Sequence, residues 1–191
     1  MKLSDGEKLI LLMLCQIHEH LKLKGDVTDT ELVKEAIHSG NLWGLEWGMP
    51  GVFHGSETSD EVVSEMVNIL AMWQRLEESF NNLNAKDKEW LAAQSDLSKN
   101  VKFHGFDGNS QIEVHYISSA RFLIEQLDRF EIFKGRDLNA HMPTLDAYRR
   151  MLPVFEPILK QMSNRDFTKE QIHEVMDAYR HPESPRFVKD L

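Results

Sequence analysis

The sequence predicts an all-α fold, a helical hairpin followed by a second, bundle-like helical part with negligible strand. Apolar residues recur at steps of three and four along most of the chain, and capping residues precede several of these runs. Segments with the alternating period of a β-strand are nearly absent. We expect one domain over 1–191, with a hairpin part over 1–100, a second helical part over 101–180 and a tail over 181–191.

The first predicted helix runs from Ser4 to about Lys24. Its apolar residues recur at helical spacing, but a solid apolar run ending at Cys15 widens the stripe almost all round the helix. A helix with so much apolar surface should be either deeply buried or placed at a subunit contact.

A second, short helix is predicted between Thr28 and Gly40. Thr28 and Glu31 have the spacing of a capping box, and Gly40 suits the helix end. The following segment, 41–57, is rich in glycine and predicts an irregular loop. It also carries large aromatic residues that are costly to leave in water, so the loop docks either on its own body or on a partner. The candidate interface residues are Trp43, Trp47 and Phe53.

The third predicted helix is a long packing helix. Thr58 and Glu61 repeat the capping box, and apolar residues then alternate between steps of four and three as far as Phe80. This spacing is typical of a helix packed lengthwise on another, and the helix should end near Asn81. A shorter helix is expected over 85–97.

Residues 101–103 predict an extended segment, followed by a glycine-rich turn. Ser110 can then cap a helix that runs to about Arg129. This helix has two apolar faces, so we expect it to be sandwiched between neighbours. Arg121 lies on its second face and would be a charge between layers or at a subunit contact, where it needs an acidic or carbonyl partner.

Residues 133–142 predict a loop, after which Pro143 suits the first turn of another helix. Pro153 and Pro157 fall on the outer face of this helix, where water can replace the lost backbone bonds, so either one kinked helix or two short ones is expected. Thr168 and Gln171 then cap a last helix, before a frayed tail or arm.

Composition excludes several classes of protein. The net charge of −9 opposes binding to phosphate backbones, so a nucleic-acid partner is disfavoured. The longest apolar run is far too short to cross a bilayer and lacks the features of a secretory signal, so we expect no membrane association. Cys15 is the single cysteine, which fits a reducing cytoplasm and predicts a buried, inert thiol.

No metal or cofactor is expected. His173 and Asp177 lie one helical turn apart and could chelate together, but a closed zinc site normally needs four protein ligands. The glycine spacings of dinucleotide-binding and triphosphate-binding loops do not occur, and no catalytic residue can be named.

The best polar constellation is the turn at 104–110. Its glycines allow close backbone approach, and it leads into a helix N-terminus that could hold an anion. A small carboxylate or phosphate could therefore bind here, while the simpler alternative is that Asp107 or Ser110 only caps the helix. The candidate ligand-binding residues are Asp107, Ser110, Arg121, His141 and Arg149.

Several motifs of the second half of the chain carry a family resemblance. They are Phe103-His104-Gly105-Phe106-Asp107, Ala120-Arg121-Phe122, Asn139-Ala140 with Met142-Pro143, and Tyr148-Arg149-Arg150-Met151-Leu152. On these motifs the chain resembles the YfbU family of uncharacterised bacterial proteins. The resemblance implies a mainly helical, cytoplasmic and homo-oligomeric protein, and it supplies no catalytic residue. Segment 41–57 and the residues after Tyr179 do not follow the family pattern.

Our leading hypothesis is an oligomeric interaction or regulatory protein without catalysis. The absence of catalytic spacing and the heptad-like seams favour it. Two alternatives stay open. One is a small-molecule-binding protein or enzyme with a site near 105–110, and the other, which the acidic charge disfavours, is a nucleic-acid-associated regulator.

Overall fold

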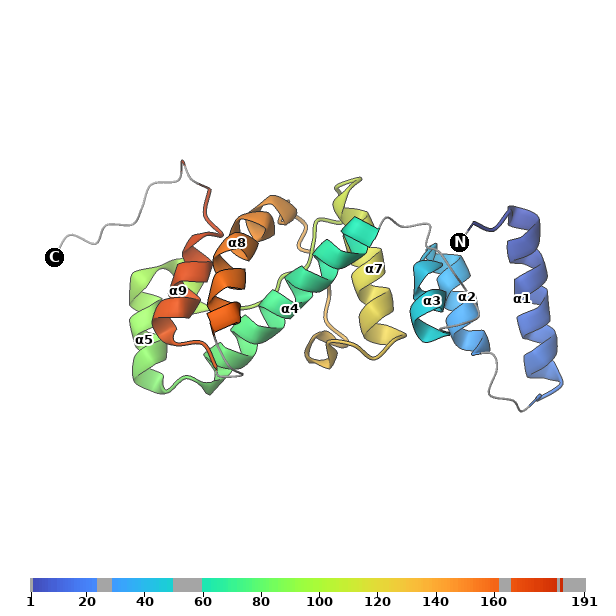
Figure 1. The fold of residues 1–191 in the computed structure, drawn as a ribbon, viewed down its shortest axis with the longest axis horizontal. Helices are drawn as coiled ribbons and strands as arrows, with labels where there is room; N and C mark the ends of the chain where they lie inside the picture. The colour runs from blue at the N-terminus through green and yellow to red at the C-terminus, as the bar shows by residue number, and fades with distance from the viewer. Residues whose placement is uncertain (1, 24–28, 50–59, 162–165, 182, 184–191) are drawn as a thin grey trace. The chain divides into compact units, whose positions relative to one another are not determined.

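The computed structural model describes residues 2–23, 29–49, 60–161, 166–181 and 183. In these residues the chain forms nine α-helices, a short 3-10 helix and no strand, which confirms the all-α fold (Figure 1). A single isolated β-bridge joins Phe106 and Asn139. The elements are α1 (Asp5–His20), α2 (Thr30–Ser39), α3 (Trp43–Gly48), α4 (Asp60–Asn82), α5 (Ala85–Gln94), α6 (Asp96–Lys99), α7 (Glu113–Glu125), η1 (Glu131–Phe133), α8 (Leu145–Gln161) and α9 (Lys169–Asp177).

The helix starts follow local side-chain chemistry. Full capping boxes form at α1, between Ser4 and Glu7, and at α9, between Thr168 and Gln171. The side chain of Asp29 caps α2 by accepting from the Leu32 amide. The expected caps Thr28 and Thr58 lie outside the described residues.

The chain divides into two compact units, each built from two separate stretches. Unit 1 comprises residues 1–66 and 115–136, and unit 2 comprises residues 67–114 and 137–191. The boundaries fall inside α4 and close to the start of α7.

A buried amide organises the centre of unit 1. The Asn41 side chain donates to the Ser118 carbonyl and hydroxyl oxygens, and its oxygen accepts from the Trp43 indole at 3.0 Å and the Ser119 hydroxyl at 3.2 Å. Gly44 lies against Phe122 so closely that a Cβ there would come within 1.9 Å of the ring. The segment that follows α2 is therefore fixed to α7 by specific contacts.

The prediction of an irregular loop over 41–57 is wrong for the first part of this segment, because residues 43–48 form α3. The aromatic residues of this helix supply enough buried contact to order a single turn and a half despite the glycines. Trp43 is buried, whereas Trp47 stacks edge-on against it with half of its surface exposed. Phe53 lies outside the described residues.

Within the described part of the chain, helix α1 is covered on one side only. It packs beside α2 (Figure 1), with Cys15 buried and Lys34 reaching Glu19 across the pair at 2.8 Å. Burial raises the pKa of the Cys15 thiol, in accordance with the inert role expected. The deeply buried alternative for this helix is wrong, since its apolar residues Leu9, Ile10, Met13, Leu14, Ile17 and Leu21 are each 51–59% exposed.

Helix α7 is buried on one face and only partly on the other. Ile117 and Ile124 of the second face are buried, but Val114 is exposed. Arg121 is exposed as well, so the prediction that its charge lies between two layers of this chain is wrong within the described residues. Water solvates this guanidinium, and no buried acidic partner is needed.

Unit 2 packs around aromatic side chains from its two stretches of chain. Helices α5, α6 and α9 contact one another, and α9 also contacts α8. Phe167 packs on Phe155 with ring centroids 5.6 Å apart, and its amide donates to the buried Ser79 hydroxyl. The last part of α4 supplies Trp73 to the same core.

Helix α8 is continuous through both prolines, so the alternative of two short helices is wrong. Pro153 and Pro157 are exposed, as their predicted outer face requires. Pro143 lies two residues before the helix rather than in its first turn. Thr144 takes the capping position instead, and a carboxylate from elsewhere in unit 2 binds the first amides.

Candidate functional site

Two motif segments of unit 2 lie side by side. The Phe106 amide donates to the Leu138 carbonyl at 2.9 Å, and the Ala140 amide donates to the Phe106 carbonyl at 2.8 Å. Gly105 adopts a φ of +87°, and a Cβ at this position would lie 1.9 Å from the Leu138 carbonyl oxygen. Only glycine fits this turn, because both the backbone angle and the adjacent strand-like segment exclude a side chain.

The Gly105 carbonyl is bound from the start of α8. It accepts from the Thr144 hydroxyl at 2.9 Å and from the Tyr148 hydroxyl at 2.8 Å. Tyr148 is fully buried, and this burial raises the pKa of its phenol. The hydroxyl therefore stays protonated and serves as a structural donor.

Glu113 is the buried hub of these segments. Its carboxylate accepts from the Asp107 amide at 2.8 Å, from the Thr144 hydroxyl at 3.1 Å, and from the Thr144 and Leu145 amides at 3.1–3.2 Å. These last two amides belong to the start of α8, whose dipole favours a negative charge. One carboxylate thus connects the turn, the beginning of α7 and the beginning of α8.

Asn139 holds the other side of the turn. Its side-chain oxygen accepts from the Gly108 amide at 2.9 Å and from the His141 amide at 3.0 Å. The backbone amide of Asn139 donates to the Asp137 carboxylate at 2.9 Å. The second motif segment is therefore fixed by backbone-directed bonds at each end.

The predicted ligand-binding residues do not all come together. Asp107 is buried and accepts from Asn109, and the Ser110 hydroxyl oxygen accepts from the Ile112 and Glu113 amides. His141 and Arg149 are exposed, with Arg149 3.7 Å from the carboxylate of Asp146 on its own helix. Arg121 belongs to unit 1.

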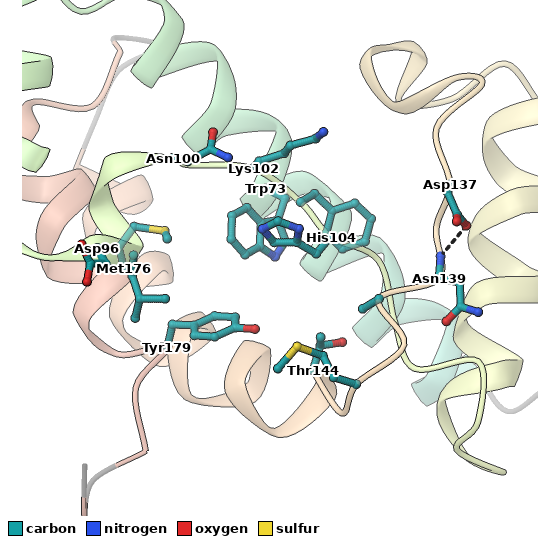
Figure 2. A pocket seen from close by; sticks show the side chains of 14 residues that line it. Trp73, Asp96, Asn100, Lys102, His104, Asp137, Asn139, Thr144, Met176 and Tyr179 are labelled. Carbon is teal, nitrogen blue, oxygen red and sulfur yellow. Dashed lines mark hydrogen bonds between the residues drawn. The ribbon is translucent and has the colours of Figure 1, made fainter. Parts of the chain in front are cut away.

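A cavity of about 490 Å³ opens beside the two paired segments (Figure 2). None of the five predicted ligand-binding residues lines it. Its lining comes from α4, from residues 96–104, from the segment after η1, and from α9. Its walls are Trp73, Asp96, Leu97, Asn100, Lys102, Phe103, His104, Asp137, Asn139, Ala140, Met142, Thr144, Met176 and Tyr179.

Tyr148 connects the cavity wall to the motif core. Its ring lies 5.5–6.1 Å from the rings of Trp73, Phe103, Phe106 and Tyr179, mostly in edge-on or tilted orientations. Such aromatic contacts fix the wall in one arrangement. The aromatic side of the cavity therefore belongs to the packed core of unit 2.

Two features escaped prediction from the sequence. Glu113 stands three residues after Ser110, which is the spacing of a capping box, but its carboxylate crosses to α8 instead of returning to Ser110. The cavity had no local signal, because its walls come from four distant segments.

No group of three or more His, Cys, Asp or Glu side chains suitable for a metal lies among the described residues. His173 contacts the Ser98 hydroxyl at 3.3 Å and the edge of Trp90. Across the same part of the chain, no helix combines the length and apolarity needed to span a bilayer.

Comparisons with known proteins show the family to which the chain belongs. UPF0304 protein MJECS11 from Methanocaldococcus jannaschii is 30% identical over 118 residues, which are 59% of this chain. The chain spans 65% of the length of that relative. No solved structure matches the chain significantly. The model of the YfbU domain matches residues 1–178, and the chain therefore belongs to the YfbU family.

Proposed function

We propose that the protein acts without catalysis, as a homo-oligomer in the reducing cytoplasm whose copies associate through α1, with a role in interaction or regulation. The observation that carries this proposal is the exposed apolar face of α1. Isolated exposed apolar residues are ordinary on a protein surface, but a continuous apolar stripe typically marks a contact surface.

The spacing of this face fits a helix-to-helix seam. Ile10, Leu14, Ile17 and Leu21 follow steps of four, three and four, with Met13 beside them. All five are more than half exposed. Cys15 and the half-buried Leu11 and Leu12 point the other way, toward the side that packs on α2. The stripe is therefore separate from the contact that folds unit 1.

The helix dipole of α1 favours a second copy, packed antiparallel, as the partner. Acidic Asp5 and Glu7 occupy the first turn, where they complement the positive end of the dipole. Antiparallel packing places the dipoles of the two helices in opposite directions, which is favourable. A two-fold contact of this kind uses the same surface on both copies. Trp47, half exposed in the same unit, is a candidate for the edge of the contact.

The test is the molar mass in solution, measured by light scattering at micromolar concentration. We expect the wild-type chain to be a dimer or higher oligomer and Leu14→Glu to be a monomer. Each copy loses the burial of one leucine, about 2 kcal/mol, so the dissociation constant should rise by roughly a hundredfold or more.

Gln16→Glu is the matched control. It adds the same charge on the flank of the stripe and should keep the oligomer. Circular dichroism should be unchanged in both variants. A monomeric wild-type chain, or a Leu14→Glu variant that still associates, would overturn the proposal.

A further inference from the structure

We propose that the cavity of unit 2 binds a linear organic diamine, with one ammonium group at each end and the methylene chain along the aromatic wall. This inference does not depend on association through α1, because every lining residue lies in unit 2.

The wall suits an alkyl ammonium ion. Trp73, Phe103 and Met176 are almost completely buried behind this wall, so the surface offered to a ligand comes from the partly exposed Tyr179 ring and the exposed Met142 thioether. Ammonium groups and the methylenes next to them bind favourably to aromatic faces. The Tyr179 hydroxyl, which has no hydrogen-bond partner among the described residues, also lines the cavity and can accept from an ammonium N–H.

Two carboxylates stand at opposite sides of this wall. Figure 2 shows Asp96 on one side and Asp137 on the other, with Trp73, His104 and Tyr179 between them in this view. Both carboxylates are exposed, and neither forms an ion pair with a described residue. A ligand with a positive group at each end can satisfy both, whereas a monoamine can satisfy only one.

The balance of charge favours a cation over an anion. Lys102 is the single lysine or arginine among the lining residues, against two carboxylates. In Figure 2 its side chain extends away from Tyr179. The chain as a whole carries a net charge of −9, which raises the local concentration of cations.

The size of the cavity is compatible with this ligand. A volume of about 490 Å³ falls within the usual range of roughly 300–1,000 Å³ for small-molecule sites. A short diamine leaves room for water around its ammonium groups, which keeps the cost of desolvating them low.

The experiment is a titration of the full-length chain followed by NMR shifts of the Trp73 indole and by calorimetry. Putrescine and cadaverine are the diamine probes, butylamine is the monoamine control and glutarate is the anionic control. We expect the diamines to bind at least several-fold more tightly than butylamine, and glutarate not to bind.

Charge-changing variants then give the sign of the interaction. Asp96→Asn and Asp137→Asn should each weaken diamine binding about threefold, the size expected of an exposed ion pair. Lys102→Ala should strengthen it by a similar factor, because a repulsive charge is removed. Asp146→Asn, an exposed carboxylate outside the cavity, should leave the affinity unchanged.

Opposite results overturn the proposal. They are glutarate binding more tightly than the diamines, Lys102→Ala weakening binding, equal affinities for cadaverine and butylamine, or no shift at Trp73 with any amine. Asn at 137 keeps an oxygen that can accept from the Asn139 amide, so a loss of binding in that variant is not a loss of the turn.

Discussion

The N-terminal helix pair of unit 1 and the aromatic core of unit 2 use apolar residues in opposite ways. In unit 2, Trp73, Phe106 and Tyr148 are almost completely buried, and Trp73 and Phe106 each contact Tyr148 through ring edges. In α1, by contrast, residues of similar hydrophobicity stay more than half exposed. These core side chains therefore find their partners within unit 2, whereas α1 has an apolar face without a partner among the described residues.

Polar groups show the same difference. Unit 2 holds its motif segments with a buried carboxylate, Glu113, that accepts from four donors. The α1–α2 pair is joined by Lys34 and Glu19, which are both partly exposed. Buried charge-assisted bonds are strong and specific, but an exposed ion pair contributes little. Unit 2 therefore has a buried polar connection between its segments, whereas the ion pair between α1 and α2 is partly open to water.

The largest effect is expected from Gly105→Ala. The new Cβ would lie 1.9 Å from the Leu138 carbonyl oxygen and would occupy a φ of +87°. The paired segments would have to separate, so the free energy of unfolding should fall by about 3 kcal/mol or more, as judged by urea denaturation.

Gly135→Ala is the matched control for this prediction. Gly135 also has a positive φ, +72°, but a Cβ there meets nothing within 4 Å. It should cost only about 1 kcal/mol, the strain of the backbone angle alone. Equal losses for the two glycines would refute the role of close approach at Gly105.

A smaller effect is expected from Glu113→Gln. The amide keeps one acceptor oxygen but places an NH₂ group against backbone donors, so unfolding should become easier by roughly 2–3 kcal/mol. Glu174→Gln, at an exposed position of α9, should be close to neutral. Equal stability of wild type and Glu113→Gln in urea titrations would show that the carboxylate is not a hub.

The reactivity of the Cys15 thiol tests how α1 packs on α2 in unit 1. It is buried between α1 and α2, and burial raises its pKa, so the reactive thiolate is scarce near neutral pH. Reaction with a disulfide reagent should be about tenfold slower or more in the native protein than in denaturant. A native rate close to the denatured rate would mean that α1 does not stay packed on α2.

The smallest effect concerns the partly buried pair of Asp87 and Lys169, whose charged atoms lie 2.6 Å apart. The hydrogen bond that Lys169 donates to the Asp87 carboxylate lowers the pKa of Asp87 below 3.8 and raises the pKa of Lys169 above 10.5. Because the folded Asp87 pKa is depressed, its stabilisation is present above pH 3.8 and is lost as pH falls through the folded pKa. The Lys169 contribution is present below pH 10.5 and is lost as pH rises through its folded pKa.

Thermal unfolding of Asp87→Asn tests this pair. The difference in melting temperature from wild type should shrink at acid pH below the ordinary aspartate pKa, and should be constant from pH 5 to pH 8. A difference that persists unchanged at pH 2 would exclude the ion pair as its cause.

Local chemistry accounts for the parts of the fold that could be predicted. Ser4 with Glu7 and Thr168 with Gln171 form capping boxes that need only neighbouring residues. The outer positions of Pro153 and Pro157 followed from helical geometry in the same way. Such features depend on a few adjacent residues, and the sequence displays them directly.

Long-range contacts explain what could not be predicted. Helix α3 forms because Trp43 packs on Phe122, with ring centroids 5.5 Å apart, and no local signal announces this contact. The burial of α1 depends on contacts with segments distant in sequence. The sequence alone therefore could not decide between a deeply buried helix and a helix at a subunit contact. The cavity needed the bridge between Phe106 and Asn139, which joins residues distant in sequence.

Hydrogen–deuterium exchange at several protein concentrations compares the two regions in a single sample. If copies associate through α1, the amides of α1 should exchange more slowly as the concentration rises through the dissociation constant, because local opening must then compete with association. The core amides of α8 in unit 2 should exchange at a rate that does not change. Protection of α1 that is independent of concentration would contradict the proposed contact.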